Sequence, residues 1–151
     1  MSLQNHTYMD LALEVAKRSV ARGEVPVGAV IVQNNQLVVR AGNRVEGDKD
    51  PTAHAEILAI RAASKMLDST HLVDCDLYVT LEPCTMCAAA ISFARIRNLY
   101  FGAYDTKGGG IESGVHFFGQ KTCFHAPEVF GGINEIQCGR IIQKFFHMLR
   151  N

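Results

Sequence analysis

The sequence predicts a single α/β domain in which helices cover a mixed sheet. The chain has 151 residues, the length of one ordinary domain, and a domain of that size buries roughly 68–70% of its unfolded surface. Hydrophobic residues make up 48% of the chain and charged residues 20%. This globular composition excludes disorder, collagen and coiled coil for the whole chain. After a first helix the predicted elements follow in the order ββαβαβ, which favours a mixed sheet with helices packed on it.

The first third of the chain predicts a helix followed by a β-hairpin. In residues 8–22 apolar side chains recur at steps of three and four, the period of an amphipathic helix. Gly23 follows as a natural helix end. Residues 27–32 are almost wholly apolar and predict a strand buried on both faces. The polar run 33–36 is a turn signal before a second strand over residues 37–41.

The middle of the chain alternates helices and strands. A polar loop over residues 42–53 leads into a helix over residues 53–67. A strand is predicted at Asp76–Thr80, a helix rich in small residues at Cys84–Ala94, and another strand at Asn98–Tyr104.

The last third is less regular. Residues 107–110 predict a flexible glycine loop, which lacks the Lys-Ser/Thr ending of a phosphate-binding P-loop. Residues 111–131 give no clear pattern, except for a possible short strand at Glu128–Phe130. A final helix with one apolar stripe is predicted over residues 134–148. There is no internal repeat and no linker, so residues 1–151 are expected to form one domain.

Charge and aromatic residues are unevenly distributed. The chain has 15 basic and 15 acidic residues, and this balance argues against a strongly basic nucleic-acid binder. Residues 1–91 nevertheless hold 8 Lys and Arg against 11 Asp and Glu, whereas residues 92–151 hold 7 against 4 and all eight Phe. Basic and aromatic residues together can bind single-stranded nucleic acid. The alternative is a Phe-rich core under a mildly basic surface.

The sequence predicts neither a membrane span nor a disulfide framework. The longest nearly apolar run, Val25–Val32, is far shorter than the about 20 residues that a membrane helix needs. The first fifteen residues carry two acidic side chains, which does not suit a secretory signal. The five cysteines are odd in number, and Cys84 and Cys87 lie three positions apart. We therefore expect a cytoplasmic protein whose paired cysteines bind metal or do redox chemistry.

Two short segments carry the chemistry. His54-Ala55-Glu56 lies at the start of a predicted helix, and Pro83-Cys84-Thr85-Met86-Cys87 lies where a strand turns into a helix. One His and two Cys suit zinc, and three protein ligands leave the open position of a catalytic site. A helix N-terminus favours the Cys84 thiolate, and Cys87 follows one turn later on the same face. Either segment alone is a weak signal, but together they are specific.

Glu56 is the predicted proton shuttle. Zinc lowers the pKa of a bound water from about 15.7 to about 7, and a neighbouring carboxylate can move that proton to a ring nitrogen and then to a leaving amine. Residues i and i+2 of an ideal helix point about 200° apart. Glu56 and His54 can therefore face the same metal only if His54 lies in an irregular first turn or if the Glu56 side chain curls back.

These motifs resemble the zinc-dependent nucleobase deaminases, whose signature is His-x-Glu followed by Pro-Cys-x-x-Cys. The similarity is greatest to the bacterial tRNA-specific adenosine deaminases and covers nearly the whole chain. The segments that carry it, besides the two above, are Glu24–Val30, Gly42–Arg44, Asp50–Ala53, Leu77–Glu82, Phe101–Asp105 and the pair Phe145-Phe146.

The resemblance implies a fold, a reaction and partners. The fold would be the three-layer α/β/α cytidine-deaminase-like fold with a five-stranded mixed sheet, in a homodimer. The reaction would be the hydrolytic conversion of adenosine to inosine at the wobble position of an arginine tRNA, whose anticodon loop would be the partner. The cofactor would be one Zn²⁺ per chain.

The resemblance also implies a role for each site residue. The metal ligands would be His54, Cys84 and Cys87, with Glu56 as the catalytic acid and base. The substrate-binding residues would be Asn43 at the purine edge, the Ala55 backbone amide at the reacting centre, Asp105 near the neighbours of the flipped nucleotide, and Phe145 and Phe146 on a C-terminal helix that holds the anticodon loop.

The substrate stays open at this stage. Residues 111–131 differ from the better-known members of the family, in a region expected to touch RNA or a partner subunit. A deaminase of a free base or nucleoside, such as guanine or cytosine, would use the same zinc chemistry, and the neutral overall charge favours it mildly. A zinc-stabilised binding module without catalysis is the third alternative. Glu56 argues against it, because a structural zinc site closes with four ligands.

Overall fold

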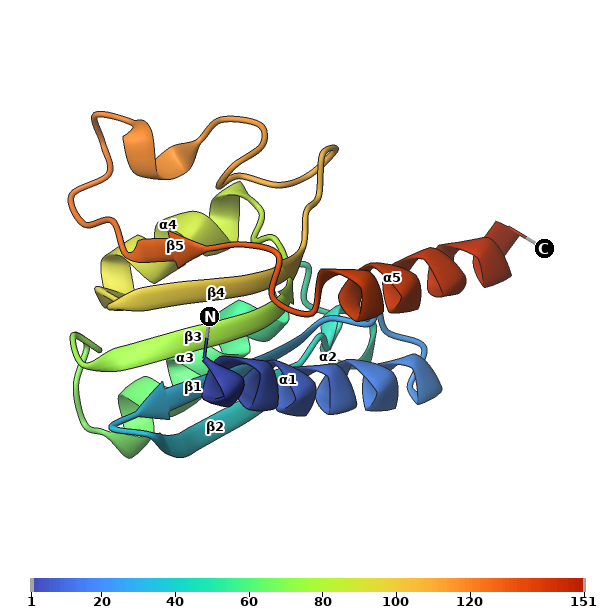
Figure 1. Cartoon of the computed structure of the whole chain (residues 1–151), viewed down its shortest axis with the longest axis horizontal. Helices are drawn as coiled ribbons and strands as arrows, with labels where there is room; N and C mark the ends of the chain where they lie inside the picture. The colour runs from blue at the N-terminus through green and yellow to red at the C-terminus, as the bar shows by residue number, and fades with distance from the viewer. Residues whose placement is uncertain (1, 151) are drawn as a thin grey trace.

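A five-stranded mixed sheet forms the centre of the protein (Figure 1). The structure, a computed structural model, describes residues 2–150. The spatial order of the strands is β2-β1-β3-β4-β5; β1 pairs antiparallel with both β2 and β3, and β3, β4 and β5 run parallel. The strands are β1 (Gly28–Gln33), β2 (Gln36–Gly42), β3 (Cys75–Leu81), β4 (Asn98–Ala103) and β5 (Glu128–Phe130).

Helices cover both faces of the sheet, so the three-layer α/β/α fold is confirmed. In Figure 1, α1 (Leu3–Ala21) and α5 (Glu135–Arg150) lie on the near side, and α3 (Ala55–Met66) and α4 (Thr85–Ala94) lie behind. The second half of α5 extends beyond the edge of the other layers. A one-turn helix, α2 (Val45–Asp48), follows β2.

The core consists of two clusters, one on each face of the sheet. Ala29 and Ile31 of β1 belong to the cluster under α3 and α4. Their neighbours Val30 and Val32 belong to the cluster under α1. All four are 0–3% exposed, which confirms the prediction of a strand buried on both faces, because alternate side chains of a strand point to opposite sides.

Helix starts depend on caps that the apolar period does not show. The first helix begins at Leu3 rather than at residue 8, because the Ser2 hydroxyl accepts the backbone N–H of Asn5 (3.2 Å) and caps the helix.

The loop predicted over residues 42–53 contains the short helix α2. Of the unassigned residues 111–131, Phe117–Gly119 form a 3₁₀ turn, η1, and Glu128–Phe130 form the predicted strand.

The Phe side chains divide between the core and the surface. Phe117, Phe118 and Phe130 are half-buried and pack against the core clusters. Of the eight Phe, only Phe101 is buried. Phe93, Phe124 and Phe146 are 76%, 83% and 42% exposed, respectively. The core is built mainly from Ala, Val, Ile and Leu, since small side chains let helices lie close to the sheet.

The cysteines differ in burial. All five cysteines are free thiols. Cys75 and Cys138 are buried, as small apolar residues would be, whereas Cys123 is half-buried. Across residues 2–150, every helix is too short or too polar to cross a membrane.

Gly28 is a critical contact between α1 and β1. A Cβ atom at this position would lie 1.9 Å from the Ala12 carbonyl oxygen. Gly28→Ala is therefore expected to lower the free energy of unfolding by about 1–3 kcal/mol, the usual cost of overpacking. Gly139→Ala in α5 is the control: its Cβ would meet nothing within 4 Å, and Ala should stabilise the helix by about 0.8–1 kcal/mol. Urea denaturation measures both, and equal effects of the two changes would contradict this packing.

Candidate active site

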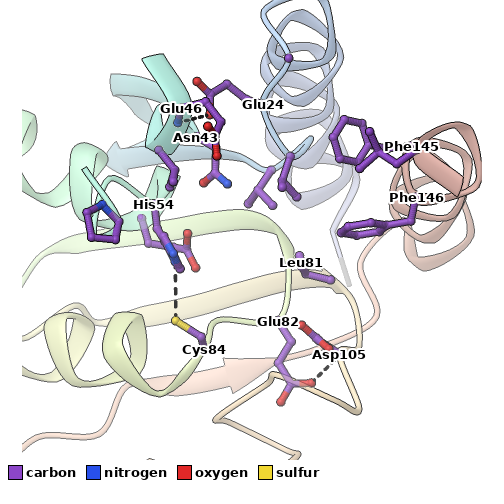
Figure 2. A pocket seen from close by; sticks show the side chains of 17 residues that line it. Glu24, Asn43, Glu46, His54, Leu81, Glu82, Cys84, Asp105, Phe145 and Phe146 are labelled. Carbon is purple, nitrogen blue, oxygen red and sulfur yellow. Dashed lines mark hydrogen bonds between the residues drawn. The ribbon is translucent and has the colours of Figure 1, made fainter. Parts of the chain in front are cut away.

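Most of the predicted site residues border one cavity of ≈ 720 Å³; Ala55 and Cys87 are fully buried beside it. Figure 2 shows His54 and Cys84 facing each other across its floor, with Phe145 and Phe146 of α5 at its outer side. The walls also include Asn43, Glu56 and Asp105. The fold therefore brings together residues more than 100 positions apart in the sequence.

His54 is the N-cap of α3, and this position settles how it faces the metal site. Its backbone is extended, with φ −73° and ψ 151°, so its side chain does not follow the helical rotation. Glu56 lies in the first turn of α3 and is 4% exposed. Of the two arrangements considered above, the structure has the irregular first turn.

Cys84 and Cys87 present their thiols to the same point as His54. Cys84 is the N-cap of α4, and Cys87 is fully buried within its first turn. The Cys84 Sγ and Cys87 Sγ atoms lie 3.6 Å and 3.5 Å from His54 Nδ1, respectively. Tetrahedral zinc with Zn–S of about 2.3 Å and Zn–N of about 2.0–2.1 Å requires an S···N separation of about 3.5 Å. All three ligand atoms lie within 4.8 Å of one another, so the donor set fits zinc.

Hydrogen bonds within the cluster shift the pKa values of its three side chains in different directions. Hydrogen bonds from Cys87 and then from His54 lower the pKa of the Cys84 thiol to about 4. The same hydrogen bond raises the pKa of Cys87, which keeps its proton, and the contact with Cys84 raises the pKa of His54. Cys84 is thus the ligand in which the thiolate form is most favoured, and zinc binds cysteine as the thiolate.

Glu56 is a buried carboxylate with a raised pKa. Burial raises its pKa to about 7, because a buried carboxylate is poorly solvated. A group with a pKa near neutrality can both accept and donate a proton at working pH.

Asn43 is held by the Ala55 amide. The Ala55 N–H donates to Asn43 Oδ1 (2.9 Å), and Asn43 is only 8% exposed. The Ala55 N–H thus points to the Asn43 side chain at the start of α3, and its role at the reacting centre stays a prediction. The oxygen of the Asn43 amide is engaged, and its amino group is the end able to donate to a ligand.

Asp105 borders the cavity from the loop after β4. Its side chain is half-buried, and its Oδ1 accepts the backbone N–H groups of Lys107 (3.2 Å) and Gly108 (2.9 Å). Its own N–H donates to Glu82 Oε1 (3.0 Å). The carboxylate is therefore oriented by its own loop.

Phe145 and Phe146 belong to the cavity and not to the core. Phe145 is half-buried and Phe146 is 42% exposed. Their rings meet edge to face, with centroids 5.4 Å apart. Both lie in the half of α5 that extends past the sheet. The first half of α5 packs on β4 through Cys138, and a Cβ atom at Gly102 of β4 would lie 2.3 Å from the Cys138 Sγ.

The sequence reasoning missed two carboxylates of this site, Glu24 and Glu82. Each is 2% exposed and borders the cavity. The sequence held a signal for each of them, because each is an isolated charged residue beside an apolar strand. Their hydrogen-bond partners lie 22–31 positions away in the sequence, so the spacing does not reveal them.

Comparison with known proteins identifies the family. Residues 2–103 match the family described as the cytidine and deoxycytidylate deaminase zinc-binding region. The tRNA-specific adenosine deaminase of Agrobacterium fabrum is 54% identical over 143 residues, covering 95% of this chain and 94% of the relative.

Solved structures agree. A structure from studies of A-to-I editing by tRNA:A34 deaminases at the wobble position of transfer RNA is 56% identical, has a TM-score of 0.88, and aligns over 89% of this chain and 98% of its own. A guanine deaminase from Bacillus subtilis is 40% identical with a TM-score of 0.63, over 69% of this chain and 66% of its own. The matched region contains the His54, Cys84 and Cys87 cluster that fits zinc. The chain belongs to the cytidine and deoxycytidylate deaminase family of zinc enzymes.

Proposed function

We propose that this protein converts adenosine to inosine by hydrolysis at the wobble position of a transfer RNA. We further infer that the substrate is an arginine tRNA. The observation that carries the reaction is the buried Glu56 beside a three-ligand cluster at the floor of an open cavity. The relative from Agrobacterium fabrum and the solved A34-editing structure, both above 50% identity, support RNA as the substrate.

The residues of the cavity account for the proton movements. A zinc ion held by His54, Cys84 and Cys87 would lower the pKa of the attacking water to about 7. Glu56 accepts the proton of that water and donates it to the purine ring nitrogen beside the reacting carbon. Glu56 then takes the second proton of the same water, now part of the hydroxyl on the reacting carbon, and passes it to the leaving amino group as the carbon–nitrogen bond breaks. Water and adenosine are consumed, and inosine and ammonia are formed.

The cavity suits one base that has left its stack. Its volume of ≈ 720 Å³ lies within the range of about 300–1,000 Å³ usual for ligand sites. The Asn43 amide can donate to the purine edge. Phe145 and Phe146 lie where neighbouring bases can stack, and an anticodon-loop base is already unpaired, so extruding it costs little.

The second candidate is deamination of a free purine base. The guanine deaminase from Bacillus subtilis shares 40% identity over the aligned part, and its reaction needs the same metal and carboxylate. Free bases would make no use of the exposed Phe146 or of the excess of basic residues in 92–151.

We also propose a homodimer formed through the outer face of α3 and α4. Phe93 on this face is 76% exposed, and it borders a groove of ≈ 360 Å³ with Ile57, Ile60 and Ala90. An exposed aromatic ring beside an apolar groove is self-complementary: Phe93 of each copy can fill the groove of the other about a two-fold axis. A cytoplasmic location is part of the same proposal, since five free thiols suit a reducing compartment.

A substrate panel tests the proposed reaction. The substrates are an arginine-tRNA anticodon stem-loop, the same stem-loop with guanosine at the wobble position, free adenosine, guanine and cytosine. We expect inosine and ammonia from the first stem-loop, and little reaction of free adenosine, because remote binding energy positions the base. Guanine turned over faster than the stem-loop would replace the RNA assignment with the second candidate.

Glu56→Gln is the control within the same panel. It should retain about one zinc per chain, as a three-ligand site requires, and lose at least about 10²–10⁴-fold in turnover, since an amide cannot shuttle a proton. Turnover near wild type in zinc-loaded protein would remove Glu56 from the mechanism.

Replacing Phe145 and Phe146 by Ala tests the stacking role. The affinity for the stem-loop should fall by about 1–3 kcal/mol for each stacked base lost, while the melting temperature changes little, because neither ring is in the core. Phe124→Ala is the matched control, since Phe124 is 83% exposed and lies outside the cavity lining. Unchanged RNA affinity in the folded double variant would refute stacking.

Phe93→Asp tests the dimer. Sedimentation velocity should give a dimer mass for the wild type and a monomer mass for the variant, because loss of a central interface aromatic costs about 2 kcal/mol or more. Phe124→Asp introduces the same charge at another exposed ring and should leave the dimer intact. A wild-type monomer, or a Phe93→Asp dimer, would contradict this interface.

A further inference from the structure

Glu82 is a buried carboxylate whose hydrogen bonds all go to one loop. It follows β3, two residues before the ligand Cys84, and is 2% exposed. Within residues 2–150 it forms no ion pair with a Lys, Arg or His side chain. Its carboxylate accepts five hydrogen bonds: Oε1 from the Asp105 N–H (3.0 Å) and the Ser113 hydroxyl (3.0 Å), and Oε2 from the N–H groups of Ile111 (3.2 Å), Glu112 (2.9 Å) and Ser113 (3.0 Å).

These contacts tie the loop of residues 105–113 to the turn that carries Cys84. Three successive backbone N–H groups converge on Oε2, the arrangement that proteins use to hold an anion. The Gly110 N–H donates to the Pro83 carbonyl (2.8 Å), which adds a second link. Gly109 packs so tightly that a Cβ would lie 2.6 Å from Glu82 Cδ. Because both oxygens are saturated within the chain, Glu82 has no capacity left for a substrate.

Glu24 does the same at the opposite rim of the cavity. It is also 2% exposed, and it accepts the N–H groups of Glu46 (3.0 Å) and Gly47 (2.7 Å) in α2. Figure 2 shows Glu24 and Glu82 on opposite sides of His54, each turned toward its own rim.

We propose that Glu82 and Glu24 are positioning residues, which hold the two rims of the cavity in the shape that receives the substrate nucleotide. The identity of the substrate in this proposal rests on the proposed function. The part that concerns how the two carboxylates hold the rims does not. Glu82 fixes the rim that carries Asp105, and Glu24 fixes the rim formed by α2. The metal ligands and Glu56 lie at the starts of α3 and α4, whose apolar side chains pack on the sheet without using either carboxylate. Loss of either carboxylate should therefore affect substrate binding more than the chemical step.

The test compares Glu82→Gln and Glu24→Gln with a matched control. A glutamine places an NH₂ group where an oxygen accepted N–H donors, so the hydrogen bonds are replaced by repulsion. Each variant should raise KM by about tenfold or more, the value of one hydrogen bond to a charged group, with kcat and zinc content little changed. The control is Asp76→Asn at the other end of β3, which removes the carboxylate charge and the hydrogen bond from Arg97 Nη2 to Oδ2 (3.0 Å), outside the cavity lining. Asp76→Asn should leave KM unchanged.

Amide hydrogen exchange supplies a readout that does not need activity. In Glu82→Gln the amides of residues 105 and 111–113 should exchange faster, while those of β1 stay protected. If that variant does not fold, Gly109→Ala disturbs the same contact and keeps the carboxylate, so it should raise KM and speed exchange in the same loop. KM is measured with whichever substrate of the panel the wild type turns over, so failure of the RNA assignment stays separate from failure of this proposal. A lowered melting temperature with unchanged KM, unchanged exchange in residues 105–113, or equal losses in kcat and zinc would overturn the positioning role.

Discussion

The meeting of two helix N-termini is the constraint on which the site depends. α3 and α4 lie side by side on the same face of the sheet, and each begins with a metal ligand at its N-cap, His54 and Cys84. An N-cap residue has extended backbone, so its side chain can turn toward the neighbouring helix instead of following its own helical rotation. The positive ends of both helices favour the thiolate charge that zinc requires.

Small side chains make that meeting possible. Ala55, Ala59 and Ala63 of α3 and Ala88 of α4 are fully buried in the same cluster as Ile31 and Leu77 of the sheet. Larger residues at these positions would move the helix ends away from the S···N distances of 3.5–3.6 Å that suit a tetrahedral metal. The sparse use of Phe in the core follows from the same close packing, and it leaves aromatic rings available at the cavity wall and on the surface.

The floor and the rims of the cavity are built on different principles. The floor is fixed by apolar packing, which tolerates little movement. The rims are the loop of residues 105–113 and the one-turn helix α2, and they are held by buried carboxylates that accept backbone N–H groups. A carboxylate can be buried in this way because its hydrogen bonds replace those of water. This construction separates the metal site, which must be rigid, from the surfaces that select the substrate.

The sequence by itself determined the features that depend on nearby residues. The apolar run of β1, the helix period of α1 and the ligand types at two helix starts are local, and the structure confirms each of them. The start of α1 required the Ser2 cap, which is local but not periodic.

Only the tertiary structure decided which distant groups satisfy one another. The Asn43 side chain meets the Ala55 amide, Glu82 meets residues 105–113, and Glu24 meets α2. Neither the sequence spacing nor the hydropathy of these residues indicates the partner. A hydrogen bond between two separate segments forms only where the sheet and the helices bring the two segments together. For the same reason the sequence could not show whether Phe145 and Phe146 lie in the core or beside the cavity. A helix has the same pattern of apolar residues whether that side packs on the core or borders a cavity. The position of α5, whose second half extends past the sheet, decides which residues the two rings contact.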